Sequence, residues 1–188
     1  MKTQARALGI DDSRFEFRRS KRTWLVGAVF RGNLWIEGVM VDEITVDGLD
    51  VTDVVSRMVT GTRFSSQIRV TFLDGITFGG FNLVDMDELH RRTGVPVVSI
   101  VDRMPNIERI KRSMKGLPEF DKRIEILSRL ERPIRVKLSG TNKPLYVQSR
   151  GVEGNELVRI LELSRRAGTI PEALRAARMI ASALPELS

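Results

Sequence analysis

The stretch that decides the fold is Ser66–Phe81, with the sequence SQIRVTFLDGITFGGF. Its first part, from Ile68 to Leu73, is short, apolar and rich in β-branched and aromatic residues, which indicates a buried strand. The strand runs directly into Asp74 and then into a glycine-rich loop. Open α/β sheets bind ligands at the carboxyl ends of their strands, although Asp and Gly also end many strands that have no such role. Both interpretations of Asp74 depend on the rest of the chain.

The chain before this stretch predicts an antiparallel meander. Ala5–Asp12 (ARALGIDD) is a short apolar strand that also ends in acid. Thr23–Phe30 and Leu34–Val46 are two longer strands, and the residues between them have the composition and length of a hairpin turn. Three successive strands joined by short turns are expected to pair antiparallel.

After the meander, helices and strands alternate. The apolar spacing in Val51–Val59 is helical, and another helix is predicted near Leu83–Arg92, before the apolar strand Val95–Val101. Two strands joined by a helix form a parallel, right-handed crossover unit. Later segments predict helices at Asn106–Lys115, Glu119–Arg132, Asn155–Arg166 and Pro171–Leu184, and short strands at Ile134–Leu138 and Leu145–Val147. We therefore expect residues 1–188 to form a single α/β domain in which three antiparallel strands are followed by parallel ones.

Composition limits the chemistry that the chain can perform. Its 188 residues include no Cys and one His, which excludes disulfides, zinc–thiolate sites, cysteine nucleophiles and multi-His metal sites. Carboxylates remain as the available metal ligands. Their hard oxygens suit Mg²⁺ or Mn²⁺.

Charge and hydropathy indicate the class of partner. The chain has 31 Lys and Arg against 24 Asp and Glu, a net charge of +7 and a pI near 10.3. This excess favours a polyanion such as nucleic acid, and a basic protein without such a partner is the alternative. There is no apolar run of membrane-spanning length and no signal-peptide pattern, so we expect a cytoplasmic protein without a membrane partner. The sequence leaves the oligomeric state open.

Topology brings two acids together. If the first strand lies beside Ile68–Leu73 and parallel to it, Asp11 and Asp74 emerge at the same end of strands about 4.8 Å apart. Such carboxylates repel each other unless cations neutralise them, and divalent ions can also clamp the oxygens of a phosphodiester. A third ligand is expected close to the first helix, where the candidates are Asp47, Asp50 and Asp53.

Several motifs resemble a known group of nucleases. GIDDS at Gly9–Ser13 resembles the first strand of the endonuclease V group, and FLDGITFGGFNLVD at Phe72–Asp85 resembles its acid-ending strand and glycine loop. GTIPEALRAARMIA at Gly168–Ala181 is similar to the last helix of that group. With the segment VDGLDVT at Val46–Thr52, these motifs resemble the archaeal endonuclease dU family, a relative of endonuclease V, over nearly the whole chain.

This resemblance implies a ribonuclease-H-like mixed sheet flanked by helices. It also implies a DNA-repair endonuclease, dependent on Mg²⁺ or Mn²⁺, that hydrolyses phosphodiester bonds in nucleic acid containing uracil or hypoxanthine, with DNA preferred over RNA. By position in the motifs, Asp11 and Asp74 match metal ligands. Asp50, inside the matched segment before the first helix, is our choice for the third catalytic and metal-binding residue, with Asp47 in reserve.

The chain departs from the family pattern at two places. Arg178 stands where the endonuclease dU family has His and endonuclease V has Asp or His, and an arginine cannot bind a metal cation, although it can hold a phosphate. The proline–tyrosine wedge of endonuclease V is missing from residues 43–53. The alternative function is therefore a catalytically impaired nucleic-acid-binding module on the same fold.

Other residues are predicted to contact nucleic acid. Phe78 and Phe81 flank the glycine loop, where they could stack on an extruded base or cover the core beneath the loop. Arg103 follows a parallel strand and is either a phosphate ligand or a solvated strand end. The basic turn after the first strand is either solvated or, as we predict, in contact with phosphates through Arg18, Arg19, Lys21 and Arg22.

Overall fold

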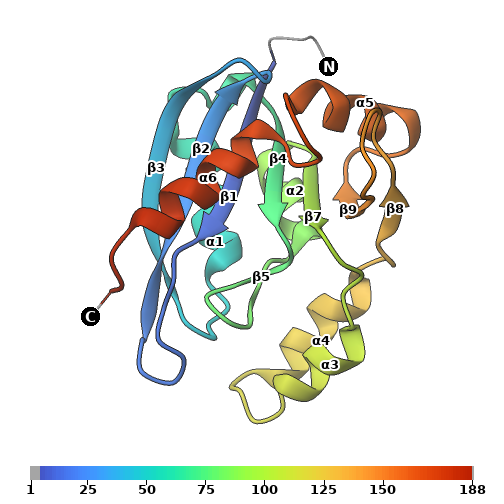
Figure 1. Cartoon of the computed structure of the whole chain (residues 1–188). Coiled ribbons are helices and arrows are strands. Elements are labelled where there is room, and N and C mark those ends of the chain that lie inside the picture. Colours follow the sequence, from blue (N-terminus) through green and yellow to red (C-terminus); the bar gives the residue numbers. More distant parts are fainter. Residues whose placement is uncertain (1–4, 188) are drawn as a thin grey trace.

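A seven-stranded mixed sheet forms the centre of the molecule (Figure 1). The computed structural model describes residues 5–187. Across the sheet the order is β3-β2-β1-β4-β7-β9-β8. The strands are β1 (Arg6–Asp12), β2 (Arg22–Arg31), β3 (Trp35–Thr45), β4 (Ile68–Asp74), β7 (Val97–Val101), β8 (Ile134–Val136) and β9 (Leu145–Arg150). Strand β4 pairs parallel with β1 and β7, and the other neighbouring strands pair antiparallel.

Helices cover both faces of this sheet. On one face, α1 (Val51–Gly61) and α2 (Met86–Thr93) pack on the larger hydrophobic cluster. On the other face, α5 (Gly154–Ser164) and α6 (Glu172–Ala183) pack on two smaller clusters, and α6 lies along β1 and β2 (Figure 1). Two further helices, α3 (Ile107–Ser113) and α4 (Phe120–Arg129), form what we call the helical arm. The arm lies beyond the end of the sheet at which β1, β4 and β7 terminate (Figure 1).

The alternation of side chains along β1 and β4 decides which face each acid occupies. Leu8 and Ile10 are fully buried on the face covered by α1. Ala7 packs on the opposite face, together with Val70 and Phe72 of β4 and with residues of α6. By this alternation Asp11 and Asp74 belong to the α6 face, whereas Asp12 belongs to the α1 face.

Gly9 lets α6 lie directly on the sheet. A Cβ atom at this position would overlap the main-chain carbonyl of Ala173 and the main-chain nitrogen of Leu174. Only a residue without a side chain allows the helix backbone to approach β1 this closely. The close packing of α6 on β1 therefore depends on Gly9.

The predicted architecture is confirmed: three antiparallel strands come first and parallel strands follow. The helix predicted near Leu83–Arg92 starts later, at Met86, because the Asp85 side chain caps it by accepting from the Glu88 amide at 3.1 Å. The preceding residues form β6 (Asn82–Leu83), which pairs with β5 (Thr77–Phe78) in a small hairpin that the sequence did not predict. In residues 5–187, none of the helices is long and apolar enough to cross a membrane.

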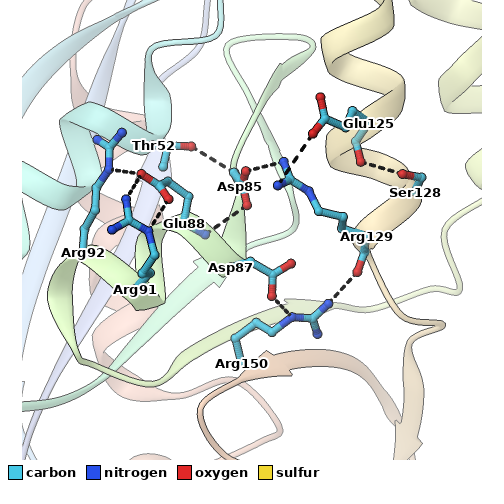
Figure 2. A network of polar contacts seen from close by, with 10 residues as sticks. All are labelled: Thr52, Asp85, Asp87, Glu88, Arg91, Arg92, Glu125, Ser128, Arg129 and Arg150. Atoms are coloured by element: carbon cyan, nitrogen blue, oxygen red, sulfur yellow. Dashed lines mark hydrogen bonds and ion pairs between the residues drawn. The ribbon is translucent and has the colours of Figure 1, made fainter.

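A polar network fixes the base of the helical arm (Figure 2). Arg129, at the end of α4, donates to the Asp85 carboxylate at 2.7 Å. Arg150 of β9 pairs with Asp87 and donates to the Arg129 carbonyl at 2.7 Å. The arm is thereby tied to α2 and to the sheet.

Candidate active site

Two carboxylates meet at the carboxyl ends of adjacent parallel strands. Ile10 pairs with Leu73, so Asp11 and Asp74 are the next residues on their strands. Both face the side of the sheet that α6 covers. The predicted placement of Asp11 beside Asp74 is confirmed, whereas their role as metal ligands stays a prediction.

Arg178 of α6 brings a cation to this pair. Its Nε donates to Asp74 Oδ2 at 2.5 Å, and its Nη2 donates to Asp74 Oδ1 at 2.6 Å. This is a bidentate, charge-assisted pair. The two side chains remain 29% and 25% exposed, so solvent reaches the pair. Arg178 also lies within electrostatic range of Asp11 and Asp102.

Among Asp11, Asp12 and Asp74, the negative charge of Asp11 is the least compensated by neighbouring groups. Burial, followed by the negative charges of Asp74 and Asp12, raises the pKa of the Asp11 carboxyl to about 7. The Asp12 amide donates to Asp11 Oδ1 at 2.9 Å, which opposes this rise. At neutral pH the folded protein therefore holds a carboxylate whose ionised form is disfavoured by its surroundings.

We predict that Asp11→Asn stabilises the metal-free protein. Because the pKa of Asp11 is raised from 3.8 to about 7 on folding, the wild type loses stability as the pH rises from 3.8 to 7. The loss at pH 8 is at most about 4 kcal/mol, and we expect the variant to recover about 2 kcal/mol, or about 4–8 °C in Tm. Thermal melting in EDTA at pH 8 measures the gain, which should vanish near pH 4.

The control for this experiment is Glu186→Gln. Glu186 is exposed and lies outside the helices, and in the described residues it has no ion-pair partner. We expect the Tm of this variant to match the wild type at both pH values. An Asp11→Asn protein that melts at the wild-type temperature at pH 8 would contradict the prediction.

Asp12 points to the other face and holds the glycine loop. Its Oδ2 accepts from the Gly79 amide at 2.8 Å, and the Gly79 carbonyl accepts from the Asp47 amide at 2.8 Å. Burial raises the pKa of Asp12 to about 6, although the hydrogen bond from Gly79 lowers it. Sequence reasoning did not assign a role to Asp12. The available signal was the pair of adjacent acids at the end of one strand.

Asp50 does not join Asp11 and Asp74, contrary to the prediction. Its carboxylate accepts from Thr45 Oγ1 at 2.7 Å and from Asn82 Nδ2 at 2.5 Å. The physical reason is that Asp50 precedes α1, which packs on the face opposite α6. The reserve residue, Asp47, is also occupied, since it accepts from the Phe81 amide at 2.8 Å. Among residues 5–187, no group of three or more His, Cys, Asp or Glu side chains is arranged to hold a metal ion.

The residues predicted to contact nucleic acid differ in their exposure to solvent. Phe78 is 1% exposed and belongs to the core, so the prediction that it stacks on a base is wrong for this structure. Phe81 is half-buried and packs against the same core, and its stacking role stays a prediction. Arg103 is exposed just beyond β7, near the site. The basic turn is also exposed, at Arg18, Arg19, Lys21 and Arg22.

Arg123 of α4 was missed by sequence reasoning, although it is among the largest fully buried side chains. Its Nη1 donates to the carbonyls of Gly48 at 3.0 Å and Phe81 at 2.6 Å, and its Nη2 donates to the Asp47 carbonyl at 2.6 Å. Burial lowers the pKa of this arginine, and the charge of Asp47 opposes the change. An arginine in an amphipathic helix gives no sequence signal of such a role, because this position is usually solvated.

Comparison with known proteins identifies close relatives. A family model described as "Endonuclease dU" matches residues 3–185. The "UPF0215 protein" of Methanothermobacter thermautotrophicus is 44% identical over 183 residues, covering 97% of this chain and 88% of that protein. A solved structure of a protein of unknown function from Archaeoglobus fulgidus has 36% identity and a TM-score of 0.83, covering 96% of this chain and 98% of that one.

More distant solved structures share the fold. Endonuclease V of Ciona intestinalis, in complex with a 24mer DNA containing an inosine followed by a ribo-adenosine, has a TM-score of 0.61 at 12% identity. The match covers 95% of this chain and 84% of that chain. At this identity the likeness concerns the fold alone. The predicted ribonuclease-H-like fold, a mixed sheet flanked by helices, is confirmed.

Proposed function

The chain belongs to the endonuclease dU family, and from this premise we propose that it is an endonuclease that cleaves nucleic acid containing deaminated bases. The proposed reaction is the hydrolysis of a phosphodiester bond near uracil or hypoxanthine, with DNA preferred over RNA and with Mg²⁺ or Mn²⁺ as cofactor. Family membership supports a nuclease that acts on nucleic acid. The base specificity, the metal and a role in DNA repair are part of the proposal.

The observation that carries this proposal is the grouping of Asp11, Asp74 and Arg178 at one end of the sheet. The bidentate donor pair of an arginine matches the oxygens of a phosphate as well as those of a carboxylate. Arg178 holds Asp74 in this way and remains partly exposed. A scissile phosphate that reached this position would meet a guanidinium and two carboxylates together.

A divalent cation fits the chemistry of these carboxylates. In the described part of the chain, Asp11 has no ion-pair partner, and its carboxylate accepts only the hydrogen bond from the Asp12 amide. A half-buried carboxylate beside two other acids is costly unless a cation neutralises it, and Mg²⁺ and Mn²⁺ prefer such hard oxygen ligands. Asp11 and Asp74 would hold the ion, which when bound would stabilise the negative charge that develops on the phosphate.

Arg178 has two possible partners in this scheme. While it holds both oxygens of Asp74, that carboxylate is less available to a cation. A phosphate oxygen can accept the same two N–H groups, which would release Asp74. We infer that Arg178 exchanges Asp74 for the phosphate when substrate binds, and that it then orients the phosphate.

A cleavage screen tests the proposed function. Oligonucleotides of DNA and RNA, single- and double-stranded, would carry uracil, hypoxanthine or no deaminated base, and would be incubated with Mg²⁺, Mn²⁺ or EDTA. We expect at least one deaminated substrate to be cut with a divalent cation and none to be cut in EDTA. Failure to cut any substrate with either metal would refute the nuclease proposal.

A second candidate function rests on the same ion pair. Because Arg178 occupies both oxygens of Asp74, the site could bind nucleic acid without cleaving it. This module would bind DNA with a strong dependence on salt and with equal affinity in EDTA and in Mg²⁺. The screen above separates the two functions when binding is measured on the same oligonucleotides.

A further inference from the structure

The helical arm carries a concentration of basic residues that the site itself does not use. Residues 103–115 include one acid, Glu108, and the cations Arg103, Arg109, Lys111, Arg112 and Lys115. On α3, Ile110 packs against the core and Met114, just after the helix, is fully buried. The apolar side of α3 is thus fixed inward, which leaves its basic side to solvent.

Four of these cations are exposed and uncompensated. We call them the basic stripe: Arg103, Arg109, Arg112 and Lys115. Among the described residues, none of the four has an ion-pair partner, whereas Lys111 pairs with Glu108 at 3.1 Å. Many other arginines of the chain are held in ion pairs, for example Arg92, Arg129 and Arg150. Cations without intramolecular partners are the ones available to phosphates.

The stripe begins beside the candidate active site. Asp74 pairs with Ile100 of β7, so Arg103 follows three residues after the neighbour of Asp74. Asp102, the residue before Arg103, lies within electrostatic range of Arg178. In Figure 1 the helical arm extends from this end of the sheet, and Arg109 and Arg112 of the stripe belong to its first helix, α3.

The arm is held in a fixed position relative to the site. Arg123 of α4 binds the carbonyls of Asp47, Gly48 and Phe81, and the glycine loop between these segments donates from Gly79 to Asp12. Figure 2 shows the second attachment, in which Arg129 binds Asp85. These hydrogen bonds and ion pairs fix the distance between the basic stripe and the carboxylates of Asp11 and Asp74.

We propose that the basic stripe binds the sugar–phosphate backbone of DNA on one side of the bond to be cut. This inference rests on the proposed nuclease function for its biological meaning. Its test measures only the affinity for DNA and does not need cleavage. The loop between β1 and β2, which carries the exposed cations Arg18 and Lys21, leaves the same end of the sheet, away from the helical arm (Figure 1). DNA that crosses the site would then be bound by the basic stripe on one side of it and by the basic turn on the other.

The test compares two triple variants in binding assays. The stripe variant is Arg109→Gln, Arg112→Gln and Lys115→Gln. The matched control is Arg69→Gln, Arg159→Gln and Arg166→Gln, which removes three exposed cations from the amino end of β4 and from α5 and the residues after it, away from the arm (Figure 1). Affinity for a 20-base-pair DNA is measured in EDTA, so that no cleavage is needed, over a series of salt concentrations.

The logarithm of the affinity falls as the logarithm of the salt concentration rises, and each phosphate contact adds about 0.9 to the magnitude of this slope. We therefore expect the stripe variant to lose about 2–3 from this slope and the control variant to lose less than about 0.5. A further variant, Arg109→Lys with Arg112→Lys, keeps the charges and should keep the slope. Equal slopes for the stripe variant, the control variant and the wild type would overturn the proposal.

The same measurements separate this proposal from the nuclease proposal. If the stripe variant binds more weakly but the wild type cuts no substrate, the stripe stands and the nuclease function fails. If the wild type cuts DNA but the stripe variant binds as tightly as the control, the stripe fails and the nuclease function stands. Single-stranded DNA and RNA run in parallel show which backbone the stripe prefers.

Discussion

Gly9→Ala is expected to destabilise the protein by at least about 3 kcal/mol. The added methyl group would overlap main-chain atoms of Ala173 and Leu174, and a helix backbone cannot move aside as the end of a flexible side chain can. Helix α6 must then lift from β1, which exposes Val26 and Ala28 and separates Arg178 from Asp74. Thermal melting should show a Tm lower by at least about 6 °C.

Gly61→Ala provides the control for this substitution. Gly61 is the last residue of α1, and an added Cβ there would meet no atom within 4 Å. Alanine also favours helix over glycine by about 1 kcal/mol, so this variant should melt at or slightly above the wild-type temperature. A Gly9→Ala protein that melted with the control would show that α6 does not need the direct contact with β1.

Asp74→Asn is expected to reduce cleavage by about 10³-fold or more on whichever substrate the screen identifies. Asparagine keeps the size of the side chain but removes the charge that a cation would need, and it replaces one acceptor of the Arg178 pair by a donor. Affinity for DNA in EDTA should stay equal or increase, because a negative charge has been removed from a basic surface. The loss should therefore appear in kcat rather than in KM.

The comparison for Asp74→Asn is Glu156→Gln, which makes the same chemical change on the exposed surface of α5. This variant should cut at the wild-type rate. Cleavage by Asp74→Asn within threefold of the wild type would remove Asp74 from the reaction. Circular dichroism and melting of both variants would show whether a loss of folding contributes.

The sheet could be predicted because its signals are local. The strands that end at Asp12 and Asp74 are short, apolar and bounded by turn residues. The helical segment between the Asp74 strand and β7 predicts a parallel crossover. If these two strands are adjacent and parallel, Asp11 and Asp74 emerge side by side, and the register of β1 and β4 shows that they are. The ends of the helices were less predictable, because a single cap such as Asp85 decides them.

The rest of the site could not be read from the sequence, because it depends on which face each element covers. Asp50 was chosen from three acids close to the first helix, but α1 and α6 pack on opposite faces of the sheet. The resemblance to known nucleases marked Arg178 as a departure, yet only the structure shows that it holds Asp74. Arg123 illustrates the same limit, since three of the carbonyl groups to which it donates are far away in the sequence.

The contact between Arg178 and Asp74 joins residues that lie 104 positions apart, and this distance matters while the chain is being made. Synthesis proceeds from the N-terminus, so β1 and β4 leave the ribosome well before α6. Until α6 has been synthesised, Asp74 lacks its ion-pair partner Arg178, and no helix packs against Gly9. The grouping of Asp11, Asp74 and Arg178 is therefore completed only late in synthesis, and a nascent chain that ends before α6 has the two carboxylates without the arginine.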